Sequence, residues 1–216
     1  NKNDQMLHGP LADRIRPRNL SEFLGPDELT GPDGLIARMR TSDPPPSLIL
    51  WGPPGCGKTT IARLLSSELK CHFESMSAVL AGIKDVRSIV QTARHRRVSG
   101  IRTVLFVDEI HRFNKAQQDA FLPHVEDGTI ILIGATTENP SFEVISALLS
   151  RCRVVRMKPL DHGQLSTIAK RALTDCETGL GERKLRISED ALQLLCECSN
   201  GDARSLLNVL EIAAFR

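Results

Sequence analysis

The segment that most constrains this chain is LILWGPPGCGKTTIA, residues 48–62. An apolar run leads into a glycine-rich loop, and the apolar pattern resumes after one lysine and two threonines. The loop fits G-x-x-x-x-G-K-[ST] with Gly52, Gly57, Lys58 and Thr59. Glycines allow the backbone to wrap closely, so that several N–H groups and the start of the next helix face a phosphate group. The segment therefore predicts a strand, a phosphate-binding loop and a helix.

Each polar side chain of this loop has an expected role. Lys58 supplies a mobile positive charge for the outer phosphates, and Thr59 offers its hydroxyl to magnesium. A glycine- and proline-rich turn without a ligand is the alternative, and the flanking strand and helix patterns count against it. We expect the phosphates to be bound by Gly52, Pro53, Pro54, Gly55, Cys56, Gly57, Lys58, Thr59 and Thr60.

The second motif is acidic and follows the phosphate loop by about fifty residues, in TVLFVDEIHRF, residues 103–113. Its four apolar residues predict a buried strand that ends in Asp108 and Glu109. Carboxylates at the carboxyl end of a parallel strand lie where α/β proteins bind their ligands. We expect Asp108 to hold magnesium through water and Glu109 to polarise an attacking water molecule.

The remaining pattern predicts an α/β protein followed by a small all-helical part. With 216 residues, of which 41% are hydrophobic, the chain has room for one full domain and a smaller one. After Pro159 only helical spacing continues. The predicted strands are 47–51, 72–76, 103–107, 129–135 and 154–157, and the predicted helices between them are 58–69, 83–97, 115–122 and 141–150.

Composition limits the partners. The chain has no tyrosine and one tryptophan, which argues against an aromatic stacking surface for single-stranded nucleic acid. Its net charge is only +2, so any contact with nucleic acid or a membrane must come from a local patch. One local basic cluster, Arg94, Arg96, Arg97 and Arg102, is either a solvated helix end, which we favour, or a contact to the DNA backbone. The six cysteines form no zinc spacing, and no apolar run reaches the length of a membrane span. We therefore expect free thiols and an intracellular protein that does not contact a membrane.

Several motifs together resemble one protein family. The phosphate loop, LFVDE, IGATTENP, LLSRC and GDAR occur in the order found in AAA+ ATPases of the clamp-loader branch. Residues 108–144 closely resemble the RarA/MgsA family, which includes the eukaryotic Werner-helicase-interacting ATPase, and the resemblance runs from Pro10 to the end.

The resemblance implies a P-loop AAA+ core with a five-stranded parallel sheet at 26–158 and a helical lid at 159–216. Residues 1–25 would line the nucleotide pocket. ATP and Mg2+ are the implied cofactors. The implied partners are further copies of the chain in a tetramer, DNA at replication forks, gaps or ends, and replication and repair proteins. The implied location is the nucleus in a eukaryote, or the cytoplasm and nucleoid in a bacterium.

The resemblance also implies roles for single residues. Thr137 corresponds to the first sensor of the γ-phosphate or attacking water, and Arg204 to the sensor-2 arginine. Arg151 matches the finger that reaches the ATP of a neighbouring subunit, with Arg153 as a second choice; a guanidinium suits this role because it stays charged and forks onto phosphate oxygens. The adenine pocket would include Ile15, Pro17 and Leu24.

The chain departs from the family in three places. Cys56 stands where most phosphate loops have threonine, and we expect its thiol beside Lys58 to be reactive. Gly25 is followed by proline instead of glutamine. The chain stops after the lid, whereas the family continues into a helical domain that holds the tetramer. His111 and Asn114, just after the acidic motif, could relay between nucleotide and DNA or could cap the next helix.

The motifs thus predict a magnesium-dependent ATPase, and the resemblance implies that it acts in replication-fork maintenance, recombination and repair. Two alternatives remain. One is a clamp-loader-like or branch-migration ATPase, and the other is an adaptor that ATP switches and that recruits proteins with little turnover.

Overall fold

The computed structural model describes residues 9–215, which divide into two compact units. The α/β unit contains residues 19–52 and 58–157. Of the described residues, the helical unit contains 9–18, the short segment 53–57, and 158–215. The phosphate loop is thus shared between the units in sequence, and its middle belongs with the helical unit.

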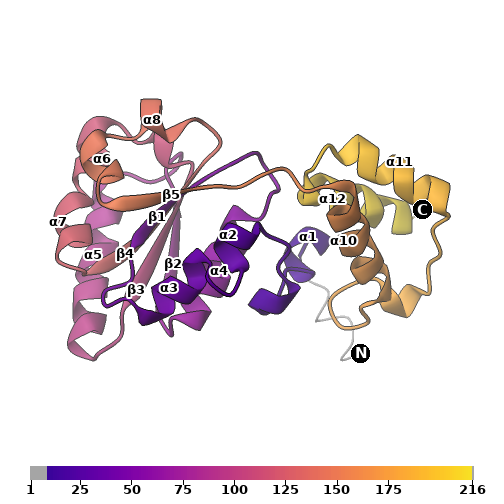
Figure 1. Ribbon diagram of the computed structural model, residues 1–216, viewed down its shortest axis with the longest axis horizontal. Helices are drawn as coiled ribbons and strands as arrows, with labels where there is room; N and C mark the ends of the chain where they lie inside the picture. Colours follow the sequence, from indigo (N-terminus) through magenta and orange to yellow (C-terminus); the bar gives the residue numbers. More distant parts are fainter. Residues whose placement is uncertain (1–8, 216) are drawn as a thin grey trace. The chain divides into compact units, whose positions relative to one another are not determined.

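The α/β unit is built on a five-stranded parallel sheet in the order β2-β3-β4-β1-β5 (Figure 1). This arrangement confirms the fold predicted from the sequence. The middle strands β3 and β4 are buried, and their sequences are almost continuously apolar, as expected for a parallel sheet with both faces covered. The strands are β1 (Ser47–Trp51), β2 (His72–Ser77), β3 (Thr103–Asp108), β4 (Ile130–Thr136) and β5 (Cys152–Arg156).

Helices cover both faces of this sheet. Figure 1 shows α5, α6 and α7 on one side and α3 and α4 on the other. The helices of this unit are α2 (Asp27–Thr30), α3 (Leu35–Thr41), α4 (Lys58–Glu68), α5 (Ile83–Val98), α6 (Lys115–Asp119), α7 (Leu122–Glu126), α8 (Pro140–Glu143) and α9 (Ser146–Leu149), with 3-10 turns at Leu20–Glu22 and Ile110–Arg112.

Two of the predicted helices are broken in the structure. The stretch predicted at 115–122 ends at Asp119, and α7 begins at Leu122. The stretch predicted at 141–150 is interrupted at Val144 and Ile145, which have extended backbones with ψ of 135° and 141°. The cause of this second break is a tertiary contact, because the N–H of Ile145 donates to the side chain of Gln118 at 2.9 Å.

The core of the α/β unit brings the segment after β3 onto β4. Ile110 is fully buried, and a Cβ added at Gly134 would lie 2.8 Å from its Cδ1 atom and 2.8 Å from Cδ1 of Ile49. Glycine at position 134 therefore allows the 3-10 turn Ile110–Arg112 to pack directly on the sheet.

The helical unit contains α1 (Leu11–Arg14), α10 (His162–Thr174), α11 (Glu189–Ser199), α12 (Ala203–Ala214) and a 3-10 turn at Gly181–Arg183. Asp161, Ser188 and Asp202 cap the three longer helices with their side chains. Each cap satisfies backbone N–H groups that would otherwise lack a partner in the first turn.

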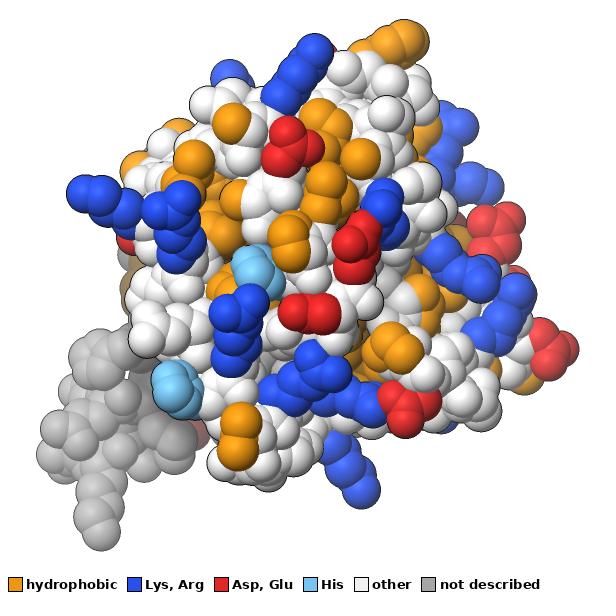
Figure 2. Space-filling view, turned by 90° about the vertical axis from the view of Figure 1, so that its left-hand side faces the viewer, with side chains coloured by type: hydrophobic (Ala, Val, Ile, Leu, Met, Phe, Trp, Pro, Cys, Tyr) orange, Lys and Arg blue, Asp and Glu red, His pale blue; other side chains and the backbone are white. Residues whose placement is uncertain are grey.

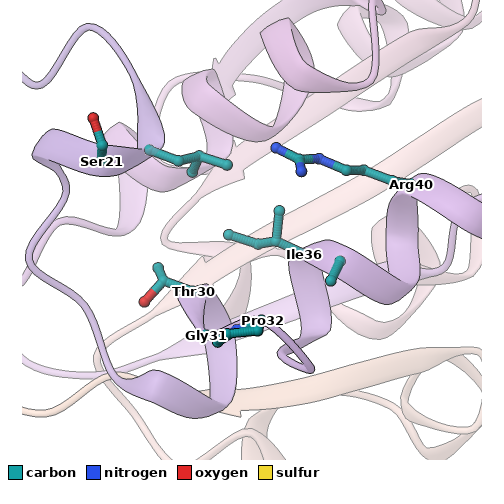
Figure 3. Close-up of a pocket in the computed structure, with 8 residues that line it drawn as sticks. Ser21, Thr30, Gly31, Pro32, Ile36 and Arg40 are labelled. Carbon is teal, nitrogen blue, oxygen red and sulfur yellow. The ribbon is translucent and has the colours of Figure 1, made fainter.

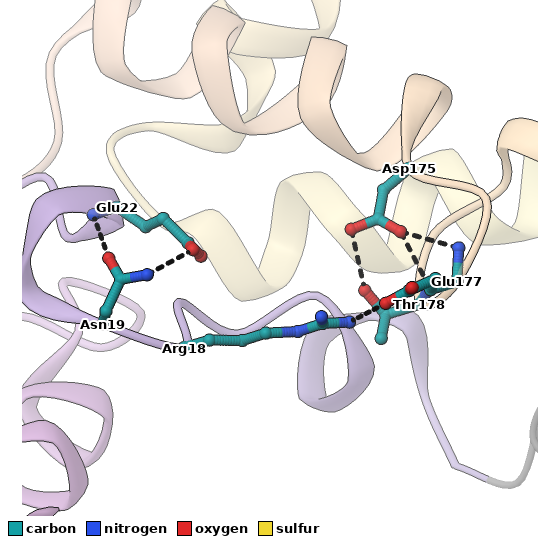
Figure 4. Close-up of polar contacts among 6 residues, drawn as sticks. All are labelled: Arg18, Asn19, Glu22, Asp175, Glu177 and Thr178. Carbon is teal, nitrogen blue, oxygen red and sulfur yellow. Dashed lines mark hydrogen bonds and ion pairs between the residues drawn. The ribbon is translucent and has the colours of Figure 1, made fainter.

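The first helix completes the core of this unit. Leu11 is fully buried, and its N–H donates to the carboxylate of Glu211 on α12 at 3.0 Å. Arg14 forms an ion pair with the same carboxylate at 3.2 Å. Further along, Arg18 pairs with Glu177 at 2.8 Å, next to a turn in which Asp175 accepts bonds from Glu177 and Thr178 (Figure 4). Asn19, the first residue of the α/β unit, caps the turn that contains Glu22 (Figure 4).

Among residues 9–215, the longest apolar helix falls short of what a membrane crossing requires.

Candidate functional site

The phosphate loop begins where β1 ends. The N–H of Gly52 donates to the carbonyl of Thr136 on β4 at 3.1 Å, and a Cβ at position 52 would lie 2.3 Å from the carbonyl of Met157. Lys58 opens α4 with only 8% of its surface exposed, and its Nζ donates to the Gly52 carbonyl at 2.7 Å. A buried ammonium favours an anionic ligand, because burial of the charge is otherwise costly. Thr59 and Thr60 follow it and are half-buried.

The middle of the loop packs on the start of α12, within the helical unit. Gly55 has φ of 68°, and a Cβ there would lie 1.8 Å from Oδ1 of Asp202. The N–H of Ala203 donates to the Gly55 carbonyl at 3.3 Å. Only glycine fits this approach, so the loop and the first turn of α12 form one surface. Arg204 lies in that turn with an exposed side chain.

The remaining loop residues differ in exposure. Pro53 is half-buried, Pro54 is exposed, and Gly57 has φ of 94°. Cys56 is buried, with 2% of its surface exposed. This burial argues against the reactivity expected for its thiol, because a reagent must reach the sulfur before any thiolate can react.

The acidic motif follows at the end of β3. Asp108 is the last residue of the strand, and Glu109 adopts φ of 54° and ψ of 45°. A left-handed backbone at a residue other than glycine costs free energy, and such positions concentrate at functional sites. The strands β1, β4 and β3 are parallel and adjacent, so Lys58, Asp108 and Glu109 all follow the same edge of the sheet.

The oxygen donors at this edge suit a hard divalent cation. Within the part of the chain that the structure describes, three or more His, Cys, Asp or Glu side chains nowhere gather as a metal cluster. Thr59 contributes a hydroxyl and Asp108 a carboxylate, both hard oxygen ligands. Mg2+ accepts such a sparse set because it keeps several waters and takes substrate phosphate oxygens as further ligands.

A polar chain links the end of β4 to the acidic motif. The Thr136 hydroxyl is fully buried and lies 2.9 Å from Nδ1 of His111. Nε2 of the same imidazole lies 3.3 Å from Oε2 of Glu109, and 8% of the His111 side chain is exposed. Thr137, the predicted sensor, comes directly after β4 and is half-buried. Thr136 is not among the residues predicted from the sequence, where its only signal is the pair of threonines at the end of an apolar run.

The sequence left undecided the roles of His111 and Asn114, which follow the acidic motif, and the structure gives these two side chains different contacts. Asn114 caps α6, since its Oδ1 accepts from the Gln117 N–H at 2.9 Å. His111 instead contacts Thr136 and Glu109. The capping alternative therefore describes Asn114, and His111 belongs to the edge of the sheet that carries the predicted site.

Arg151 lies in the turn immediately before β5, where it is exposed. It forms an ion pair with Glu126 of α7, and its Nη1 donates to the carbonyl of Ala147 at 2.7 Å and to Oγ of Ser150 at 3.1 Å. Arg153, the second choice, is exposed on β5 itself.

The three adenine-pocket candidates have different surroundings. Ile15 is buried in the core of the helical unit, and its carbonyl accepts from Nη2 of Arg171 at 2.8 Å. Pro17 and Leu24 are half-buried. A separate pocket of about 240 Å3 in the α/β unit contains none of these residues. Figure 3 shows its lining, which comes from Leu20, Ser21, Thr30, Gly31, Pro32, Ile36, Ala37 and Arg40.

Three of the four arginines of the basic cluster on and after α5 have acidic or carbonyl partners. Arg96 pairs with Glu74 at 3.2 Å, Arg97 donates to the carbonyl of Asp127 at 2.6 Å, and Arg102 pairs with Asp43. Figure 2 shows the α5 side of this unit, with acidic and hydrophobic side chains interspersed among the basic ones. These partners favour the solvated alternative over a surface that binds the DNA backbone.

Comparison with known proteins agrees with this geometry. Residues 48–160 match the ATPase family associated with various cellular activities (AAA). The replication-associated recombination protein A of Coxiella burnetii is 51% identical over 205 residues, which are 95% of this chain and 46% of that protein. The ATPase WRNIP1 of Dictyostelium discoideum is 47% identical over 204 residues, which are 94% of this chain and 23% of that protein.

The fold also matches a solved structure, the RuvB Holliday junction branch migration motor of Thermotoga maritima. The TM-score is 0.73 at 27% sequence identity, over 92% of this chain and 64% of that one. The chain spans about half the length of the first bacterial relatives that it matches. These matches confirm the resemblance that the motifs indicated: the chain belongs to the AAA family of ATPases and is similar to proteins named replication-associated recombination protein A and WRNIP1.

Proposed function

We propose that this chain is the ATP-hydrolysing part of a magnesium-dependent ATPase that acts in replication-fork maintenance, recombination and repair. One observation carries the proposal: a buried lysine, a strand-end aspartate and a strained glutamate follow the same edge of one parallel sheet. Relatives named for replication-associated recombination support the DNA-linked role.

The residues of this chain divide the work of hydrolysis. The N–H groups of the phosphate loop and Lys58 bind the phosphates of ATP. Glu109 accepts a hydrogen bond from a water molecule and directs it in line with the bond that breaks, while Thr137 contacts that water or the γ-phosphate. Arg204, and Arg151 of a neighbouring copy, neutralise the negative charge that develops on the phosphates.

Thr59 and Asp108 would hold Mg2+, which when bound neutralises charge on the outer phosphates. Ile15, Pro17 and Leu24 would line the adenine site. Residues 1–25, 26–158 and 159–216 would act as the pocket-lining segment, the ATPase core and the lid.

The proposed assembly is a homo-oligomer, because a finger such as Arg151 requires a second copy, and the family resemblance implies a tetramer in the whole protein. DNA with forks, gaps or ends and proteins of replication and repair are its partners. The proposed location is the nucleus or the bacterial nucleoid and cytoplasm. A branch-migration or clamp-loader-like ATPase is the second candidate, and the likeness to RuvB favours it. An ATP-switched adaptor with little turnover is the third.

The rate of ATP hydrolysis with and without DNA tests the proposal. The protein is assayed alone and with single-stranded DNA, closed duplex, duplex with free ends, gapped duplex and four-way junctions. Stimulation by ends or gaps supports fork maintenance, whereas stimulation by four-way junctions together with strand movement supports branch migration. Slow hydrolysis that no DNA changes supports the adaptor and contradicts the proposal.

A further inference from the structure

Glu109 is linked to the end of β4 by a series of three polar contacts. The N–H of Glu138 donates to the Thr136 hydroxyl at 3.0 Å. That hydroxyl lies 2.9 Å from Nδ1 of His111, and Nε2 of His111 lies 3.3 Å from the Glu109 carboxylate. The distance of 3.3 Å is at the long end for a hydrogen bond, and contacts of catalytic groups often shorten when substrate binds.

The chemistry of the groups assigns the protons. An ionised carboxylate only accepts hydrogen bonds, so the imidazole nitrogen facing Glu109 must carry a hydrogen. In the neutral ring the other nitrogen, Nδ1, is then an acceptor, and the Thr136 hydroxyl donates to it. In the charged ring both nitrogens donate, and the hydroxyl turns to the Glu138 carbonyl, 3.2 Å away. In both forms the nitrogen that lies 3.3 Å from the Glu109 carboxylate carries a hydrogen.

The surrounding structure fixes the ring between its two partners. Ile110 is packed against Gly134, two residues before Thr136 on the same strand. The His111 side chain is 8% exposed, so few other orientations are open to it. Glu109 has a left-handed backbone, and its side chain is 30% exposed, so packing encloses it less than it encloses His111.

We propose that His111 is a positioning residue, which holds the Glu109 carboxylate in the orientation needed to direct water, and that Thr136 holds His111 in turn. The inference rests on the proposed function, in which Glu109 directs the water. The contacts of His111 also connect Glu109 to β4, the strand that precedes the predicted sensor Thr137. A shift in the position of Thr136 at the end of β4 would therefore move the Glu109 carboxylate through the side chains of Thr136 and His111.

Substitutions at His111 distinguish the contribution of its contact with Glu109 from that of its contact with Thr136. The amide of glutamine reaches the place of Nε2, whereas the amide of asparagine reaches that of Nδ1. We expect His111→Ala and His111→Asn to lower kcat by roughly 10- to 100-fold, since small misplacements of a reacting group cost up to about 100-fold. KM and ATP affinity should stay unchanged.

His111→Gln should recover a large part of kcat, because it keeps a donor toward Glu109. His162→Ala, which removes an exposed histidine on α10, is the matched control and should hydrolyse ATP normally.

Thr136 is tested through its dependence on His111. Thr136→Val keeps the shape but lacks the hydroxyl, and we expect a smaller loss of kcat than for His111→Ala. Because both act through one contact, the double variant should be no slower than His111→Ala alone. Losses that multiply, a higher kcat in His111→Ala, or equal losses in the Gln and Asn variants would each overturn the proposal.

Two measurements keep this inference distinct from the proposed function. If Glu109→Gln abolishes hydrolysis but His111→Ala does not lower kcat, the function stands and the inference fails. If the protein does not hydrolyse ATP, the proposed function fails, and nuclear magnetic resonance of the His111 ring nitrogens decides about the contact. We expect the proton of the neutral ring on Nε2, with signals that shift in Glu109→Gln and in Thr136→Val. A proton on Nδ1, or signals that neither substitution moves, would overturn the inference whatever the activity.

Discussion

Glu109 has the chain's most informative backbone conformation, because its φ of 54° accompanies a place at the end of a buried strand. We expect Glu109→Gln to bind ATP as the unchanged protein does and to hydrolyse it roughly 100-fold or more slowly, since the isosteric amide cannot accept the water's hydrogen bond as a carboxylate does. Nucleotide binding and single-turnover hydrolysis measure the two effects. Glu182→Gln, on an exposed 3-10 turn, is the control. Near-normal turnover in Glu109→Gln would remove Glu109 from the mechanism.

The cysteines differ in reactivity for reasons visible at single residues. Burial raises the pKa of the Cys152 thiol to about 12 and also raises the pKa of Cys196, so less thiolate forms at neutral pH. Cys56 is 2% exposed, whereas Cys176 and Cys198 are exposed. We therefore expect alkylation at pH 7 to modify Cys176 and Cys198 first, measured by mass spectrometry of a time course. Labelling of Cys56 ahead of both would restore the reactivity expected from the sequence.

Strand β4 tolerates no side chain at Gly134, because Ile110 and Ile49 fill the space. We expect Gly134→Ala to lower the free energy of unfolding by about 1–3 kcal/mol, the usual cost of overpacking a core. Urea unfolding measures it. Gly163→Ala in the first turn of α10 should change stability by roughly 1 kcal/mol or less, since alanine favours helices. Equal effects of the two substitutions would contradict the packing described at Gly134.

Gln118 joins three segments of the α/β unit with one buried amide. Its Nε2 donates to the carbonyls of Phe113 at 2.9 Å and Glu143 at 3.0 Å, and its Oε1 accepts from Ile145. We expect Gln118→Ala to cost about 2–4 kcal/mol, because buried backbone groups lose their partners and a cavity forms. Thermal or urea unfolding tests this against Gln193→Ala, on the surface of α11. A loss as small as that of the control would show that water replaces the amide.

The sequence predicted those elements whose pattern reflects burial alone. The buried strands β3 and β4 were recognised from their apolar runs, but β5 begins two residues earlier than predicted, because Arg153 and Val154 are exposed on this edge strand. The break at Ile145 could not be predicted, since it depends on Gln118, 27 residues away. The contact of His111 with Thr136 likewise joins residues 25 apart, and their side-chain orientations follow only from the packed sheet.

The proposed role of Arg151 requires a second copy of the chain, because this arginine would contact ATP that is bound to a neighbour. Its guanidinium is bound by Glu126 and Ala147 of its own chain, so a neighbour's phosphates would have to replace these partners. We expect Arg151→Ala to bind nucleotide and lose hydrolysis. Mixed with Glu109→Gln, it should regain part of the activity, because some sites then pair an intact Glu109 with an intact neighbouring Arg151. Hydrolysis after proven subunit exchange is the measurement, and the absence of any recovery would contradict a finger that acts on a neighbour.

The bond between Leu11 and Glu211 spans 200 residues of sequence, which has a consequence for the order in which the protein can fold during synthesis. The ribosome adds about 5–20 residues per second, so α1 waits on the order of 10–40 s before α12 has been made. Until then α1 lacks its contacts with α12, while all five strands of the sheet have already been made. The α/β unit can therefore form before α1 makes its contacts with α12.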